Sequence, residues 1–121
     1  MTTATRRRSG DDTLVHRVRA ALRGVRQVKE QKMFGSIGFM VRGKLCVAAR
    51  SERIMCRIDP ATHGDAVKRK GVHAVVMKGR QYKGYVRVDG SALTTQRAVA
   101  YWVGRALKFN RTLASSARRV R

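Results

Sequence analysis

The stretch KMFGSIGFMVRGKLCV, residues 32–47, constrains the fold more than any other part of this chain. Its apolar residues Ile37, Phe39 and Val41 alternate with small or polar ones, which is typical of a strand with one buried face. Gly43 then suits a tight turn, because glycine adopts positive φ without steric cost. The pattern predicts consecutive antiparallel strands in which Gly35 marks a turn and Gly38 a close approach of the backbone.

The strand pattern continues from about Val28 to Ile58, with a further turn at residues 50–53. We expect the inward positions of its last two strands to be Leu45, Val47, Ala49, Ile54, Cys56 and Ile58. This alignment places Cys56 opposite Val47 and turns Cys46 to the other face. The two cysteines should therefore remain free, reduced thiols with structural roles.

Helical patterns occur before, between and after the strands. After Asp11 or Asp12 as a cap, apolar positions recur with helical spacing at Leu14, Val18, Ala21, Leu22 and Val25. A second helix is predicted over residues 59–71, with Asp59 as N-cap and Gly71 at its end, and Gly64 makes it weak or short. The last helix has one apolar face, formed by Val99, Trp102, Val103, Ala106, Leu107, Asn110 and Leu113.

Two more strands are predicted, at residues 73–78 and 84–89. The order is then helix, strands, helix, strands, helix. This order indicates an α+β fold with two layers, in which the helices cover one face of an antiparallel sheet.

Charge is the unusual feature of the composition. The chain has 28 lysines and arginines against 7 acidic residues, a formal net charge of +21. Such a chain attracts polyanions at long range, and nucleic acid is the first to consider. Both ends add to this charge, with Arg6, Arg7 and Arg8 in one tail and Arg118 and Arg119 in the other.

The sheet face that points away from the helices is the candidate binding surface. Its predicted members are Met40, Arg42, Cys46, Arg50, Met55, Arg57, Lys83, Tyr85 and Arg87. Three interpretations remain open for it. The face could bind nucleic acid through Arg50, Arg57, Lys83 and Arg87 on phosphates, with Tyr85 stacked on a base. It could instead form a protein or homodimer contact around Met40, Met55 and Tyr85, or it could simply face solvent.

The residues that enzymes use are present but not in a reactive arrangement. His16, His63 and His73 have no metal-ligand spacing, and the acidic residues are explained as caps, a strand end and a turn residue. The GSIG segment is followed by a strand and lacks the lysine–hydroxyl pair of a phosphate loop. We therefore expect no catalytic residues, no metal and no cofactor.

No apolar run approaches the roughly 20 residues that cross a bilayer. No apolar segment follows the arginines at the N-terminus, as a secretion signal would require. A cytoplasmic location is expected by default.

Four segments in order, KMFGSIGFMVRGKLCV, RIMCRID, GRQYKGYVRVD and AVAYWVGRALKFNRTL, resemble the N-terminal domain of the bacterial TfoX/Sxy family. The resemblance covers about residues 14–113. It implies a two-layer fold like that of type III secretion chaperones and a role in transcription regulation associated with natural competence. Full-length regulators carry a second, C-terminal domain, so we expect a stand-alone domain. The expected layout is a flexible basic tail (1–12), the domain (13–114) and a basic C-terminal tail (115–121).

Overall fold

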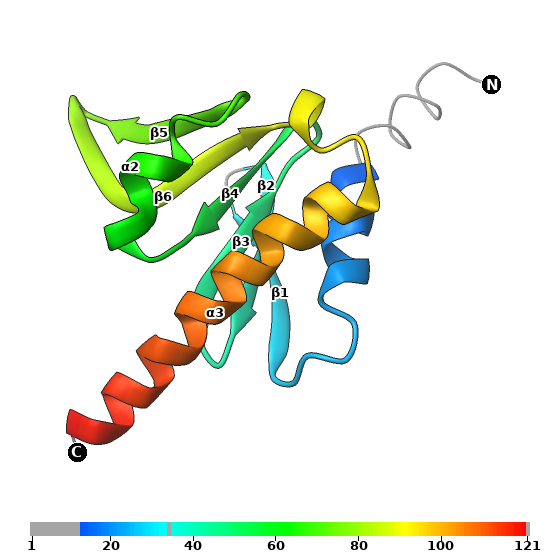
Figure 1. Ribbon diagram of the computed structural model, residues 1–121. Helices are drawn as coiled ribbons and strands as arrows, with labels where there is room; N and C mark the ends of the chain where they lie inside the picture. Colours follow the sequence, from blue (N-terminus) through cyan, green and yellow to red (C-terminus); the bar gives the residue numbers. More distant parts are fainter. Residues whose placement is uncertain (1–12, 34, 121) are drawn as a thin grey trace.

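A computed structural model describes residues 13–33 and 35–120 of the chain, without the side chains of residues 114–120. It has two layers, an open antiparallel sheet of six strands and helices that cover one face of that sheet (Figure 1). The predicted α+β class is confirmed.

The strands are β1 (Val28–Met33), β2 (Ser36–Val41), β3 (Lys44–Ala49), β4 (Arg53–Arg57), β5 (Val72–Met77) and β6 (Arg80–Asp89). Their order across the sheet is β1-β2-β3-β4-β6-β5. The helical segments are an N-terminal helix (residues 13–21), η1 (Pro60–Thr62), α2 (His63–Ala66), η2 (Gly90–Ala92) and α3 (Gln96–Val120). The long helix α3 runs diagonally across the sheet, and the N-terminal helix lies beside it (Figure 1).

Two of the hairpins close through two-residue turns with positive φ at both positions. Arg42 and Gly43 have φ of 54° and 80°, and Lys78 and Gly79 have 52° and 74°. This is the type I′ geometry, whose twist matches the twist of the flanking strands. Glycine at the second position makes both turns accessible at little cost.

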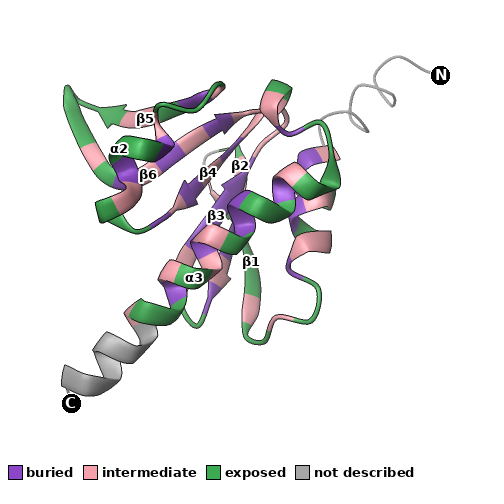
Figure 2. Cartoon of the chain, viewed as in Figure 1, coloured by how far each residue is buried: buried purple, intermediate pink, exposed green. Residues whose placement is uncertain are grey.

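The core lies between the sheet and the helices. The inward residues Val47, Cys56 and Val86 adjoin one another across β3, β4 and β6, and all three have no exposed surface. Val99 and Val103 of α3 are also buried in this core. Figure 2 shows the buried residues concentrated on the inner side of α3 and along the central strands.

The predicted strand phase is wrong at one point of β3. Phe39 pairs with Val47 but Met40 pairs with Leu45, so Cys46 is an extra residue in a β-bulge. Cys46 is consequently buried in the core rather than turned to the other face, and Leu45 lies on the outer face rather than inward. The prediction that Cys56 lies opposite Val47 is confirmed.

The second helix is short, as expected from Gly64. The backbone N–H of Ala61 donates to the Asp59 carboxylate at 2.9 Å, which confirms the predicted cap. The 3₁₀ turn η1 and the four-residue α2 follow, and the helix ends at Ala66. Residues 68–70 therefore lie in turns that lead to β5.

Candidate functional site

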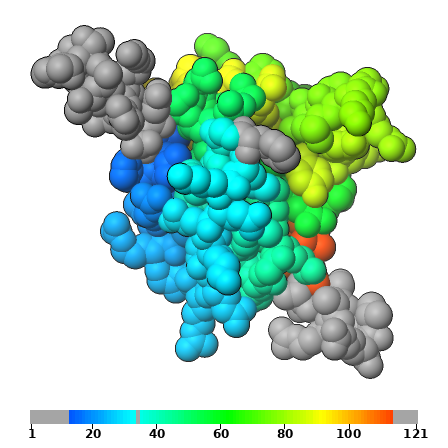
Figure 3. All heavy atoms as spheres, turned by 180° about the vertical axis from the view of Figure 1, so that it is seen from behind, coloured from blue at the N-terminus to red at the C-terminus, as the bar shows by residue number. Residues whose placement is uncertain are grey.

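The outer face of the sheet contains a hollow of about 410 Å³. Figure 3 views the molecule from behind, and strands β1 to β4 and β6 form much of this face. The hollow is lined by Met33, Ser36, Leu45, Ala48, Arg50, Arg53, Met55, Val75, Val76, Met77 and Arg87. We call it the outer hollow.

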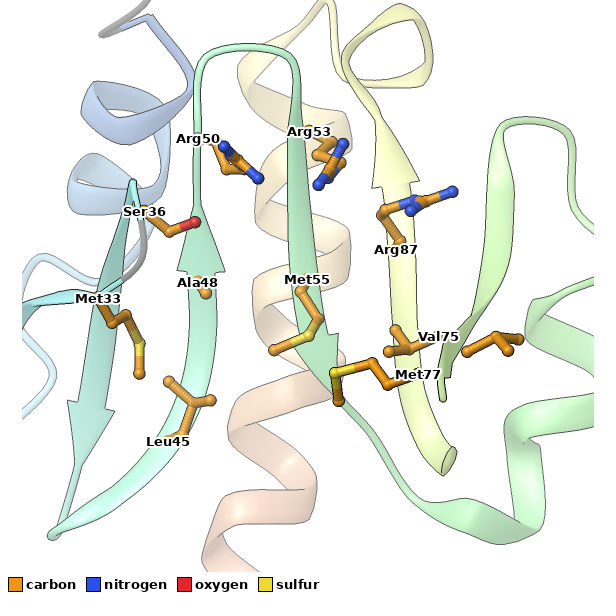
Figure 4. Close-up of a pocket in the computed structure, with 11 residues that line it drawn as sticks. Met33, Ser36, Leu45, Ala48, Arg50, Arg53, Met55, Val75, Met77 and Arg87 are labelled. Atoms are coloured by element: carbon orange, nitrogen blue, oxygen red, sulfur yellow. The ribbon is translucent and has the colours of Figure 1, made fainter. Parts of the chain in front are cut away.

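Polar and apolar residues occupy different ends of the outer hollow. Figure 4 shows Arg50, Arg53 and Arg87 at one end, whereas Leu45, Met55 and Met77 lie toward the other. The arrangement follows from the pleat, because residues two apart on one strand share a face. Arg53 and Met55 on β4 share the outer face in this way, and Arg87 on β6 lies opposite Met55.

The arginine end concentrates positive charge. The Arg50 N–H donates to the Arg53 carbonyl at 3.0 Å, so the two residues face each other across a turn. Neither these two arginines nor Arg87 forms an ion pair with any carboxylate in the described part of the chain. Like charges on neighbouring strands are unfavourable. A bound anion would relieve this repulsion.

Gly38 leaves room for the side chains of Met33 and Leu45, which both line the outer hollow. A Cβ at this position would lie 2.5 Å from Met33 Sδ and 3.4 Å from Leu45 Cδ1. The absence of a side chain therefore lets Met33 and Leu45 approach each other over β2. The sequence predicts a close backbone approach at Gly38, but the groups that lie closest are side chains.

The predicted nucleic-acid residues are distributed over more than one place. Arg50 and Arg87 line the outer hollow, and Lys83 is exposed on β6. Arg6, Arg7 and Arg8 lie outside the described residues. The backbone of α3 continues through Arg118 and Arg119, but their side chains lie outside the described part.

Arg57 and Tyr85 form a second feature, next to the outer hollow. The Arg57 guanidinium lies 5.5 Å from the centre of the Tyr85 ring and 5.7 Å from that of Phe109. Tyr82 packs edge-on against Tyr85 with ring centres 6.5 Å apart. We call Arg57, Tyr82, Tyr85 and Phe109 the arginine–aromatic cluster.

The predicted protein-interface residues do not form one patch. Met55 lies in the outer hollow, Tyr85 in the arginine–aromatic cluster, and Met40 in a separate hollow beside Arg42 and Gln27.

Sequence reasoning missed Arg53 and the exposed aromatic residue Tyr101 on α3. The sequence analysis places Arg53 in a turn. Because residues 53, 55 and 57 alternate along one strand, Arg53 shares the outer face with Met55 and Arg57. Tyr101 is 42% exposed, and Arg69 and Arg105 lie 5.0 and 5.9 Å from its ring centre. Tyr101 precedes the core residue Trp102, and only helical phase distinguishes an exposed ring from a buried one.

The histidines have structural partners. Buried His63 accepts a hydrogen bond through Nδ1 from the Gly84 N–H at 3.1 Å, which joins α2 to β6. His73 Nε2 lies 2.8 Å from Asp89 Oδ2. Within residues 13–33 and 35–120, no three His, Cys, Asp or Glu side chains gather closely enough to hold a metal ion.

Both thiols are unsuited to nucleophilic chemistry. Burial raises the pKa of the Cys46 thiol to about 12. Burial also raises the pKa of Cys56, and the nearby Cys46 adds to this effect. Thiolate is the reactive form of cysteine, so both residues remain inert thiols near neutral pH.

None of the helices that the structure describes combines the length and the apolar composition of a bilayer span. No curated protein and no solved structure matches the chain significantly. The family model described as TfoX N-terminal domain matches residues 20–110. That range includes β1 to β6 and most of α3, and hence both the outer hollow and the arginine–aromatic cluster. The chain therefore belongs to the TfoX N-terminal domain family.

Proposed function

We propose that this protein is a non-enzymatic regulatory module that associates with DNA or RNA, mainly through phosphate contacts. Its family supports a regulatory kind of function. Association with nucleic acid is not implied by the family match. It is proposed because of the charge of the chain and the arginine–aromatic cluster.

The observation that carries the proposal is the contact of the Arg57 guanidinium with two aromatic rings. Tyr85 and Phe109 lie within 6 Å of its guanidinium, and no described carboxylate forms an ion pair with it. A cation–π contact does not use up the N–H donors of a guanidinium, which remain available to phosphate oxygens. Aromatic rings beside cations are the usual means of holding single-stranded nucleic acid.

The net charge of +21 predicts how such an association behaves. Each phosphate that the protein neutralises releases condensed counterions, so the affinity falls steeply as salt rises. Phosphate contacts carry no sequence information, which predicts little sequence preference. A role in transcription regulation, or in competence, would then depend on other partners for its specificity.

Fluorescence polarisation tests this function with a labelled single strand of about 20 nucleotides and a duplex of equal length, between about 50 and 300 mM salt. We expect a linear fall of log affinity with log salt. Tyr85→Ala should weaken single-strand binding roughly tenfold, since one stacked base contributes about 1–3 kcal/mol. Arg57→Gln should reduce the salt slope by about one.

The matched control is Arg23→Gln, which removes an exposed arginine after the N-terminal helix. It should leave single-strand affinity close to the wild-type value. An affinity that stays flat across the salt range would remove the proposal. Equal effects of Arg23→Gln and Arg57→Gln would remove the role of the cluster.

A protein contact through the outer face is the second candidate. Val76 and Met77 favour it, because 59% and 50% of their surfaces are exposed beside Met55. Sedimentation velocity of the wild type and of Met77→Asp tests the homodimer version, because Met77 is an exposed residue of this patch. A wild type that sediments as a monomer, unchanged by the substitution, would argue against it.

A further inference from the structure

We propose that the outer hollow is a binding site for a single monomeric amphiphile, an aliphatic chain with a carboxylate or phosphate head group. The head would lie on Arg50, Arg53 and Arg87, and the chain on the apolar floor. This inference goes beyond the proposed function and does not depend on nucleic-acid binding.

The floor has the size and lining of a small-molecule site. The hollow measures about 410 Å³, and ligand pockets typically range from about 300 to 1,000 Å³. Leu45, Ala48 and Met55 form its central part, and all three are at least partly buried. Methionine is unbranched and polarisable, so it adapts to a flexible chain more readily than most side chains do.

The arginines define the head group. Three guanidinium groups from β4, β6 and the end of β3 lie at one end of the hollow, without an ion-paired carboxylate among the described residues (Figure 4). Asp89, the cross-strand neighbour of Arg53, forms no ion pair with it and is instead within hydrogen-bond distance of His73. Guanidinium matches carboxylate and phosphate through paired hydrogen bonds.

The outer hollow has an arginine end and an apolar end, and an amphiphile would contact both. Inorganic phosphate or a simple carboxylate would leave the floor of Leu45 and Met55 unused. A second copy of the chain would add three more arginines to this face, and like-charge repulsion would oppose any contact in which the two arginine ends approach each other. A bilayer surface is flat on this scale, whereas the outer hollow is a concave site of about 410 Å³ lined by side chains from β1 to β6.

Isothermal titration calorimetry of the full chain with decanoate, below its micelle concentration and at about pH 7.5, tests the site; the carboxylate is ionised there. We expect saturable binding with one site per chain. Acetate, which lacks the chain, and decyltrimethylammonium, which reverses the head charge, should bind at least about tenfold more weakly, because each lacks one of the two interactions.

Two variants locate the binding. Arg53→Gln removes a head contact, and Ala48→Phe fills the floor; each should lower decanoate affinity about tenfold or more. Arg97→Gln, on an exposed part of α3, removes the same charge elsewhere and should leave the affinity unchanged. Arg53 is partly exposed, so Arg53→Gln should fold normally. It therefore still tests the site if Ala48→Phe does not fold.

Several outcomes would overturn the proposal. These are binding with many sites per chain, equal losses in Arg53→Gln and Arg97→Gln, or binding to anionic vesicles without binding to monomeric decanoate. Self-association that Ala48→Phe abolishes would assign the hollow to a second copy instead. Ala48→Phe should retain oligonucleotide affinity, and Tyr85→Ala should retain decanoate affinity, so failure of this proposal is distinguishable from failure of the proposed function.

Discussion

Asn110 on α3 donates a hydrogen bond from Nδ2 to the main-chain carbonyl of Val41 at 3.1 Å. Asn110 is 2% exposed and lies on the otherwise apolar face of the helix. The Arg42 guanidinium donates to its Oδ1 at 3.4 Å. This one side chain therefore ties α3 to the end of β2, just before the type I′ turn.

Replacing Asn110 with alanine should lower the free energy of unfolding by about 1–3 kcal/mol, because the buried hydrogen bond between Asn110 and the Val41 carbonyl is lost. Urea unfolding measures this change. The control is Arg111→Ala at an exposed position, which should stay within about 0.5 kcal/mol of the wild type. Equal stabilities of the two variants would show that the hydrogen bond does not contribute.

The N-terminal helix is joined to β1 by a forked ion pair. Arg19 Nε and Nη2 donate to Glu30 Oε2 and Oε1 at 2.6 and 2.8 Å. The hydrogen bond from Arg19 lowers the pKa of Glu30 below its ordinary value, although partial burial opposes this effect. The pair thus stabilises the fold above the ordinary pKa of a glutamate, and this contribution is lost as pH falls through the lowered value.

Glu30→Gln should therefore destabilise the protein near neutral pH and make no difference in acid, below the pKa of Glu30. The loss should be under about 1 kcal/mol, since both side chains are over a third exposed. Urea unfolding at the two pH values measures it, with the exposed Glu52→Gln as control. A loss that persists unchanged in acid would contradict the role of the ion pair.

Both cysteines should be unreactive in the folded protein. Cys46 and Cys56 are at most 1% exposed, and burial raises both thiol pKa values. Ellman's reagent should label neither thiol at about pH 8 in the native state and both after urea unfolding. Thr94→Cys adds an exposed thiol as the positive control. A native cysteine that reacts as fast as this added thiol would show that the core opens readily.

Much of the fold follows from local sequence patterns. Apolar alternation predicted the strands, Asp59 as N-cap predicted the start of the short helix, and the apolar stripe from Val99 predicted α3. These signals are visible because each one repeats or lies within a few residues. The family resemblance is confirmed over residues 20–110.

The site was less predictable, because its residues meet through register. One additional residue in β3 reverses which of Leu45 and Cys46 faces the core, and alternation alone gives no sign of it. Arg53 joins Arg87 only through the β4–β6 pairing. In the sheet β4 pairs with β6 and not with β5, the next strand in the sequence. A pairing between strands so far apart in the sequence cannot be predicted from a local pattern.

Because of the bulge in β3, polar substitutions at the adjacent residues 45 and 46 should differ in their effect on stability. Leu45→Gln should cost less than about 1 kcal/mol, because the side chain lies half-buried on the outer face and its amide can reach solvent. Cys46→Gln should cost more than about 3 kcal/mol or prevent folding, because a larger polar group enters a packed core without a partner. Urea unfolding and circular dichroism distinguish the two variants. Uninterrupted alternation predicts the opposite order, so a folded Cys46→Gln beside an unfolded Leu45→Gln would place the extra residue elsewhere in β3.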